Sequence, residues 1–349
     1  GMFGMISGSS IANTVTVGTF TIPLMKRLGF SAHKAAAVET AASVNGQLMP
    51  PIMGAAAFIM AEFLGLNYTD IVFAAFIPAF TCYFALFYIV HLEAKKNGLK
   101  GEDASVLGRT WPIFIRGIHY LIPIFFLIYT LIVLRQSAQS AAFSAIMFLM
   151  VIMVVQKPFK AYLNKGKITL PLILEGFSDI GNGMVMGAKN MVSIAVATAV
   201  AGIIVGSVTL TGIGLVLAEV IDNLSGGYIM AVLFMTAFVS LVLGMGLPTT
   251  ANYIVMAALT APIIMELAGN SGYLIPTIAA HMFVFYFGIL ADDTPPVGMA
   301  AYASAAIAKS DPIVTGIQSF IYDIRTGILP FMFFFNNELL LIGGVDGED

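Results

Sequence analysis

Charged residues are scarce in this chain: 10% of its 349 residues are Asp, Glu, Lys or Arg, whereas 59% are hydrophobic. A water-soluble domain carries about 25% charged residues, and the mean hydropathy here is +0.93. Several apolar runs approach or exceed the roughly 20 residues that span a bilayer. These values exclude an ordinary soluble domain and predict an all-α polytopic membrane protein.

Cysteine is almost absent as well. The single residue, Cys82, excludes a disulfide within the chain and any metal site built from several cysteines. The formal net charge of −3 is too small to indicate binding to nucleic acid. The sequence contains no Gly-rich phosphate-binding loop and no Ser/His/Asp set, so it predicts neither a nucleotide-driven pump nor an enzyme.

One pattern occurs twice in the chain. Residues 8–25 read GSSIANTVTVGTFTIPLM and residues 247–264 read LPTTANYIVMAALTAPII, so that Asn13 aligns with Asn252 at an offset of 252 − 13 = 239. A second pattern follows each copy, MPPIMGAAA at 49–57 and TPPVGMAAY at 294–302. A polar tip, an apolar helix and a Pro-Pro break, each present twice, predict a transporter built from two repeats that meet at the ligand site.

Positive charges predict the orientation. We expect membrane spans at residues 70–91, 112–134 and 138–155, with Lys-rich loops at 93–109 and 157–167. Two spans separate these loops, so both loops lie on one face, which the positive-inside rule makes cytoplasmic. Residues 170–190 mix charges with apolar residues and predict an amphipathic helix at that interface. A crossing at about residues 191–215 then leads outward.

The two polar tips predict re-entrant hairpins. Residues 228–244 and 252–266 flank the sequence GMGLPTTA, and irregular backbone at membrane depth is tolerated only where it lines a cavity or is buried in protein. Symmetry predicts the other hairpin within residues 2–25, with its tip at 7–13. Its second arm ends at Lys26 and Arg27 on the cytoplasmic side, so the two hairpins enter from opposite faces and the repeats are inverted.

Each hairpin precedes a helix with a polar interruption. We expect helices at residues 32–64, broken at 45–51, and at 273–308, broken at 291–296, because proline removes a helix hydrogen bond and clashes with the preceding turn.

The predicted domain organisation has five parts. Residues 1–64 and 226–311 form the transport domain, and each contains a hairpin with its broken helix, the first truncated at the N-terminus. The other parts are 65–169 (scaffold helices and cytoplasmic loops), 170–225 (amphipathic arm helix and a crossing) and 312–349 (last transmembrane helix and tail).

Oxygen-bearing groups gather at the tips and breaks. Hard cations prefer oxygen ligands, and an ionisable residue within a membrane indicates function. The predicted sodium ligands are Ser7, Asn13, Thr14, Gly46, Asn252, Asp292 and Asp293. The predicted substrate contacts are Ser9, Ser10, Asn45, Thr249, Thr250 and Thr294. The alternatives are hydroxyls that only bond between helices, a simple kink at Pro-Pro, and an aspartate pair that marks the end of a span.

Other charged residues receive structural interpretations. Arg325 and Asp323 are expected to anchor the last helix at the membrane interface, and Glu39 to pair with Lys34. Neither repeated motif contains Lys or Arg. An anionic substrate would therefore be neutralised by helix N-termini and bound sodium, unless an arginine from a missing N-terminal part supplies the charge.

The motifs SGSSIANTVTVGTFTIPLM, NGQLMPPIMGAAAFIMAE, GMGLPTTANY and ADDTPPVGMAAY resemble those of the large membrane subunit of tripartite ATP-independent periplasmic (TRAP) transporters. The likeness is greatest to the TAXI-like branch, a C4-dicarboxylate permease family in which the small and large subunits are fused. It implies an elevator-type secondary transporter in the cytoplasmic (inner) membrane of a bacterium or archaeon. It further implies sodium-coupled uptake of an organic acid, such as a C4-dicarboxylate, sialic acid or an amino-acid-like acid, delivered by an extracytoplasmic solute-binding protein.

The resemblance also implies a small membrane subunit fused before this chain, and we expect the sequence to be a fragment that lacks it. Two alternatives remain open. A divalent-anion/sodium symporter of another elevator family also carries Ser, Asn and Thr at its hairpin tips but needs no binding protein. A channel would need a continuous polar pore, whereas the sequence shows two local polar breaks.

Overall fold

The computed structural model describes residues 1–101, 110–163 and 169–342. The chain divides into two compact units: unit 1 comprises residues 1–102 and 200–349, and unit 2 comprises residues 103–199. The described residues form α-helices and two short 3-10 turns, with no strand among them. Three of these helices are long and apolar enough to cross a membrane, in the ranges Tyr68–Lys96, Ala138–Tyr162 and Thr249–Asn270. The prediction of an all-α polytopic membrane protein is confirmed.

The helices of unit 1 fall into two series in the same order. The first series is α1 (Met2–Ser7), α2 (Ser10–Arg27), α3 (Ala32–Gly46), α4 (Gly54–Leu64) and α5 (Tyr68–Lys96). The second is α10 (Ile213–Ser225), α11 (Ile229–Gly244), α12 (Thr249–Asn270), α13 (Thr277–Leu290), α14 (Met299–Ala308) and α15 (Pro312–Phe335), followed by the turn η2 (Asn337–Leu340). Helices α2, α3 and α4 match α12, α13 and α14, as the sequence repeat predicts.

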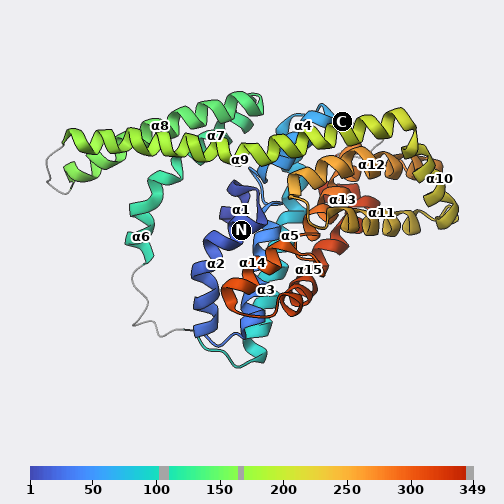
Figure 1. The fold of residues 1–349 in the computed structure, drawn as a ribbon, viewed down its shortest axis with the longest axis horizontal. Helices are drawn as coiled ribbons and strands as arrows, with labels where there is room; N and C mark the ends of the chain where they lie inside the picture. The colour runs from blue at the N-terminus through green and yellow to red at the C-terminus, as the bar shows by residue number, and fades with distance from the viewer. Residues whose placement is uncertain (102–109, 164–168, 343–349) are drawn as a thin grey trace. The chain divides into compact units, whose positions relative to one another are not determined.

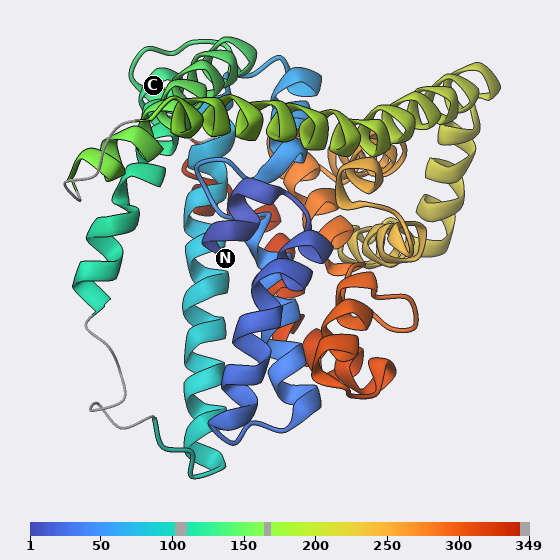
Figure 2. The ribbon, with the colours of Figure 1, turned by 60° about the vertical axis from the view of Figure 1, so that its left-hand side comes forward.

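The two series interlock within unit 1. Helix α14 packs against α2 and α3, helix α15 lies along α3, and α4 contacts α12 and α13. The blue helices of the first series and the red helices of the second therefore lie side by side in both ribbon views (Figure 1 and Figure 2). Each repeat thus completes its packing on the other.

Local sequence explains where the hairpin arms begin and end. Helix α1 ends at Gly8, which has a φ of 62°, a left-handed conformation that glycine adopts at little cost. Ser9 then caps α2 by accepting a hydrogen bond from the backbone N–H of Ala12. In the second repeat, Gly246 has a φ of 81° and the turn leads to Thr249 at the start of α12. Both turns are short, so the polar residues of each tip lie in the first turns of the second arm.

Both long helices are broken at the Pro-Pro sequences. Helix α3 ends at Gly46 and α4 begins at Gly54; α13 ends at Leu290 and α14 begins at Met299. The four halves contain 10–15 residues, which corresponds to about 15–23 Å of helix. The hydrocarbon core is about 30 Å thick, so none of these halves crosses it alone.

The lengths of α11 and α12 bear on the predicted hairpin. Helix α11 has 16 residues, or about 24 Å, which is less than the roughly 30 Å of the core. Helix α12 is longer, but 72% of its most apolar window is buried inside the protein, against 11% for α8 (Ala138–Leu163). These values show that α11 is short and that α12 is largely surrounded by protein, and the re-entrant topology stays a prediction.

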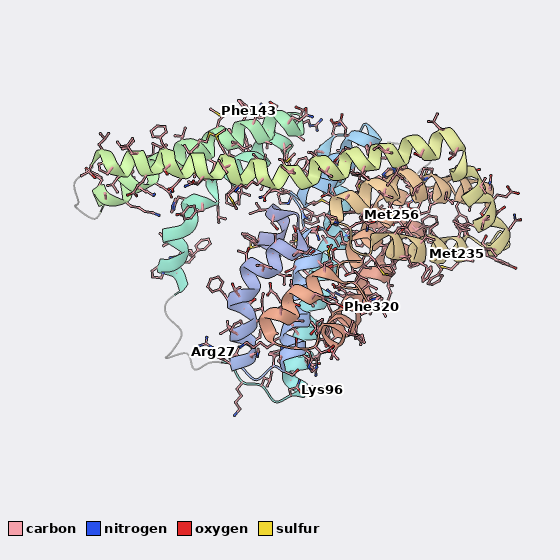
Figure 3. All side chains as sticks on the ribbon, in the orientation of Figure 1. Arg27, Lys96, Phe143, Met235, Met256 and Phe320 are labelled. Atoms are coloured by element: carbon pink, nitrogen blue, oxygen red, sulfur yellow. The ribbon has the colours of Figure 1, made fainter. Side chains whose placement is uncertain are left out.

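Cations at the helix ends agree with the predicted orientation. Helix α2 ends in Lys26 and Arg27, and α5 ends in Lys95 and Lys96. Figure 3 shows Arg27 and Lys96 at the same end of unit 1. The positive-inside rule assigns that end to the cytoplasmic face.

Unit 2 differs in detail from the expected spans. The expected span at 112–134 is divided into α6 (Thr110–Gly117), the turn η1 (Ile118–Tyr120) and α7 (Ile122–Ile132), and α7 packs against α8. The expected amphipathic helix and the following crossing form one continuous helix, α9 (Leu170–Thr211). Of the residues in the two Lys-rich loops, Arg109, Lys165 and Lys167 lie outside the described residues.

Glycines allow the first tip to approach the first break. A Cβ atom on Gly54 would lie 2.5 Å from the Cα atom of Gly8, closer than real contacts allow. Gly54 has a φ of +67° at the start of α4, and Gly65 has a φ of +63° at its end with nothing near its Cβ position. The two glycines therefore form a matched pair for mutation.

We expect Gly54→Ala to destabilise the full-length permease more than Gly65→Ala does. Both variants force alanine into a left-handed conformation, at about 1–2 kcal/mol. Gly54→Ala adds an overpacking cost of about 1–3 kcal/mol. Thermal unfolding of the purified protein in detergent measures the difference, and equal midpoints for the two variants would contradict the close approach.

Candidate functional site

A buried carboxylate joins the two hairpin tips. Asp292 lies in the second break, and its Oδ2 atom accepts hydrogen bonds from Ser10 Oγ at 2.6 Å and Thr249 Oγ1 at 2.9 Å. Ser10 is at the start of α2 and Thr249 at the start of α12, and all three side chains are at most 5% exposed. Three residues that the sequence predicted for the site are therefore in direct contact, although 282 positions separate Ser10 from Asp292.

The two aligned asparagines make equivalent contacts. Asn13 Nδ2 donates to Ser43 Oγ on α3 at 2.7 Å, and Asn252 Nδ2 donates to the Gly288 carbonyl on α13 at 2.9 Å. Because a carbonyl only accepts hydrogen bonds, the nitrogen of Asn252 must face Gly288. Each asparagine thus fixes the second arm of its hairpin to the first half of the following broken helix.

These contacts leave oxygen atoms without donors. Asn13 Oδ1 and Asn252 Oδ1 are buried and have no hydrogen-bond partner among the described residues, and the same holds for Thr14 Oγ1 and Asp293 Oδ1. Buried polar atoms are rarely left unsatisfied, and each case calls for an explanation such as a bound ion. All four atoms belong to residues predicted as sodium ligands, and neutral or anionic oxygen suits a hard cation.

A second polar cluster surrounds Asp293. Ser319 Oγ donates to Asp293 Oδ2 at 3.0 Å, and the side chains of Asp293 and Asp323 contact each other. Asn45 Nδ2 donates to Asp323 Oδ1 at 2.5 Å, while Thr326 Oγ1 donates to Asn45 Oδ1 at 2.9 Å. The cluster joins both breaks to α15, and it places Asn45 against Asp323 rather than against the tips.

Two expectations about charged residues were wrong. Asp323 is fully buried, and Arg325, predicted as an interface anchor, lies 2.9 Å from it and donates through Nε to the Cys82 carbonyl. Lys34 pairs with Glu93 rather than with Glu39. Arg325 remains inside because a buried carboxylate needs a compensating charge and hydrogen bonds.

The site holds more carboxyl groups than basic side chains. In the described part of unit 1, the ion pairs are Lys34–Glu93 and Arg325–Asp323. Asp292, Asp293 and Glu39 therefore have no ion-pair partner there, and Glu39 instead accepts hydrogen bonds from Thr21 and Ser43. Two buried carboxylates in contact repel each other, so Asp293 and Asp323 are stable together only with a shared proton or a compensating positive charge.

Several predicted residues are not brought to Asp292. Ser7 is exposed, Ser9 caps α2, and Thr294 Oγ1 donates to the Leu290 carbonyl at 2.6 Å. Thr250 is buried in the first turn of α12, and Gly46 is buried at the end of α3. These five residues lie at the tips and breaks, but none of their contacts indicates that they bind an ion or a substrate.

The sequence contained a signal for the missed residues on α15. Ser319, Asp323 and Thr326 occur at positions i, i+4 and i+7, a spacing that places polar groups on one helix face. All three are buried. A polar stripe within an apolar helix of 24 residues is typical of a membrane helix that faces a polar site.

Fold and site together define a multi-pass membrane protein of two interlocked repeats, with a buried oxygen-rich site at their junction, as in secondary transporters. A comparison with protein families matches residues 1–347 to the tripartite ATP-independent periplasmic transporter, DctM component. The chain belongs to this family and is the large membrane permease component of a TRAP transporter. The comparison with curated proteins found no match.

This assignment has two direct consequences. TRAP systems combine this component with a periplasmic binding protein and a small membrane subunit, so the chain is one part of a larger assembly. The family also removes the alternative that the chain is a divalent-anion symporter of another elevator family.

We expect Asp323→Ala to lower the free energy of unfolding by about 3–5 kcal/mol, because it leaves Arg325 as an uncompensated buried charge. The double variant Asp323→Ala/Arg325→Met should regain part of this loss. Glu93→Ala, which breaks the more exposed pair with Lys34, should cost about 1 kcal/mol or less. Denaturant unfolding of the purified permease tests this order, and a double variant no more stable than Asp323→Ala would contradict it.

Proposed function

We propose that this permease couples inward sodium movement to uptake of a small organic acid, delivered by an extracytoplasmic binding protein, in the cytoplasmic membrane. The observation that carries the proposal is the pair of equivalent asparagines. In each repeat the amide nitrogen is held by the broken helix, and the amide oxygen is buried without a donor. Two equivalent oxygen-rich positions at inverted tips suit one coupling cation in each repeat.

Sodium fits the local chemistry. The donors at the tips are amide, hydroxyl and carboxylate oxygens, which hard cations prefer. Asn13 and Thr14 would bind the cation of the first repeat. The Gly46 carbonyl and the Ser7 hydroxyl are further proposed ligands of this cation. Asn252 with Asp292 or Asp293 would bind that of the second. Each cation would offset the negative charge of the aspartates, which lack ion-pair partners within the described residues.

The substrate would bind between the tips. Helices α2 and α12 begin at Ser10 and Thr249, where unpaired N–H groups and the helix dipole favour an anion. Asp292 contacts both residues and would repel a carboxylate, so sodium would have to bind first to make the position attractive. This order gives a physical reason for obligatory coupling. A C4-dicarboxylate, sialic acid or an amino-acid-like acid satisfies these requirements.

Transport would proceed by an elevator movement. The two hairpins and two broken helices would move together as the transport domain, because they are joined by buried hydrogen bonds, whereas the helices at 112–134 and 138–155 would remain static. We further propose that this chain comes from the branch with the small subunit fused before it.

We predict that Asn13→Ala and Asn252→Ala, placed in the full-length transporter, each lower sodium-dependent uptake at least about tenfold, the scale of loss when support of a bound metal is removed. Thr236→Ala is the matched control, since this buried hydroxyl donates to carbonyls of its own helix α11. Uptake into proteoliposomes, with binding protein present and the sodium gradient varied, measures the effect. Wild-type uptake that persists without a sodium gradient would refute sodium coupling.

The substrate position has its own test. The double variant Ser10→Leu/Thr250→Leu should abolish uptake, because two leucines fill the space between the tips and remove the Ser10–Asp292 hydrogen bond. Ser310→Leu, at the turn between α14 and α15, serves as the control. Full transport by the double variant would show that the substrate binds elsewhere.

A further inference from the structure

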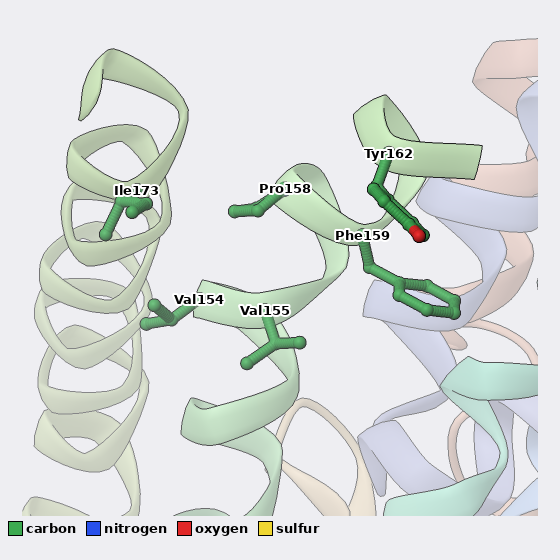
Figure 4. Close-up of a pocket in the computed structure, with 6 residues that line it drawn as sticks. All are labelled: Val154, Val155, Pro158, Phe159, Tyr162 and Ile173. Atoms are coloured by element: carbon green, nitrogen blue, oxygen red, sulfur yellow. The ribbon is translucent and has the colours of Figure 1, made fainter. Parts of the chain in front are cut away.

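The cavity in unit 2 gives no indication of a particular ligand. It has a volume of about 450 Å³, and the six side chains around it, drawn in Figure 4, are aliphatic or aromatic. Walls of this kind accept any apolar group and select none. The junction of the repeats in unit 1, by contrast, contains a buried polar group that the proposed sodium sites do not use, the carboxamide of Gln47.

Gln47 is the counterpart of Asp292 in the first repeat. The break sequences that begin at Met49 and Thr294 align at an offset of 294 − 49 = 245, and the same offset relates Gln47 to Asp292. The packing of the repeats is reciprocal as well, since α14 contacts α2 and α3 while α4 contacts α12 and α13. Reciprocal contacts are typical of two units related by a two-fold axis.

The two counterparts meet at the centre of the junction. The Gln47 carboxamide lies within reach of the Asp292 carboxylate, and side chains related by a two-fold axis can touch only where the axis passes. Asp292 in turn accepts hydrogen bonds from Ser10 and Thr249, the first residues of α2 and α12. Gln47 is therefore at the position where both hairpin tips converge.

The amide nitrogen of Gln47 lacks an acceptor. Gln47 is 2% exposed, and its Nε2 atom forms no hydrogen bond of regular geometry within the described residues. Asn13 and Asn252 leave oxygen atoms unsatisfied, which a cation can occupy, whereas an amide nitrogen only donates. Its two N–H groups allow it to face Asp292 with one and a ligand with the other. Because a buried donor without an acceptor is costly, this position calls for a ligand that accepts hydrogen bonds.

We propose that Gln47 Nε2 donates a hydrogen bond to a carboxylate oxygen of the transported acid. This inference rests on the proposed function and names one contact of its substrate. The N-termini of α2 and α12, helices of 18 and 22 residues, favour an anion at the same place. A neutral amide suits a transporter, because it orients the carboxylate but holds it less tightly than a charged donor would.

The difference between the two counterparts gives the site a direction. An aspartate at both positions would place two carboxylates on the axis, where they would repel each other and the substrate. With glutamine in the first repeat and aspartate in the second, one side of the axis offers a donor and the other a carboxylate. The carboxylate of the substrate would therefore lie on the side of Gln47 and a sodium ion on the side of Asp292.

Thermal unfolding of the purified full-length permease tests this contact, because a bound ligand raises the midpoint. Sodium chloride is titrated first without an acid, with choline chloride as the reference salt. Succinate, N-acetylneuraminate and glutamate are then each titrated in saturating sodium chloride. For an acid that binds the wild type, Gln47→Met should raise the apparent Kd about tenfold, the effect of losing one hydrogen bond to a charged group. The apparent Kd for sodium should stay unchanged.

Two further variants complete the experiment. Gln156→Met, the same change at a half-buried residue of α8, should leave both constants unchanged. Gln47→Glu keeps the size of the side chain but replaces the donor by a second carboxylate, so it should abolish acid binding while sodium still raises its midpoint.

The outcomes separate this inference from the function on which it rests. Wild-type affinity for the acid in Gln47→Met would overturn the inference. An equal loss of sodium and acid affinity would also overturn it, because Gln47 would then only support Asp292. Binding of none of the three acids by the wild type would contradict the proposed function itself, and this contact with it.

Discussion

A carboxylate taken out of water must find hydrogen bonds or positive charge, and the arrangement of unit 1 follows from this requirement at Asp292. Two hydroxyls meet it, one from each hairpin tip. Because those hydroxyls lie at the first turns of α2 and α12, satisfying one aspartate brings together the starts of two helices from different repeats. The tips then surround a position that is rich in oxygen atoms from both repeats of this TRAP permease.

The repeat explains why the two halves of the site are alike but not identical. Asn13 and Asn252 both hold a broken helix through the amide nitrogen, yet one meets a serine hydroxyl and the other a backbone carbonyl. The acidic residues are concentrated in the second break, where Asp292 and Asp293 stand, whereas the first break offers Asn45 and Gln47. The carboxyl groups are therefore distributed unequally between the two repeats.

Much of this arrangement could be predicted from the sequence, because it depends on local chemistry. Prolines dictated both breaks, and glycine and serine dictated the first tip. That Ser10, Thr249 and Asp292 lie in one region followed from assuming that the repeats meet, whereas their hydrogen bonds to one another were not predicted. The role of α15 could not be predicted from the sequence, because Asp323 and Arg325 are close in sequence and suit a surface ion pair equally well. Only packing against distant parts of the chain buries them. The division of residues 112–134 was also hidden, since apolar periodicity does not reveal a 3-10 turn.

The interlocking of half-helices has a consequence for biogenesis. A segment of 10–15 residues cannot be stable across a bilayer by itself, and α4 packs against α12 while α14 packs against α2 and α3. The partners of each half lie roughly 200 to 290 residues apart in the sequence. The first hairpin and its broken helix must therefore wait at the membrane, incompletely packed, until the second repeat emerges from the ribosome, and during that interval their exposed polar groups depend on water, lipid headgroups or an insertion factor.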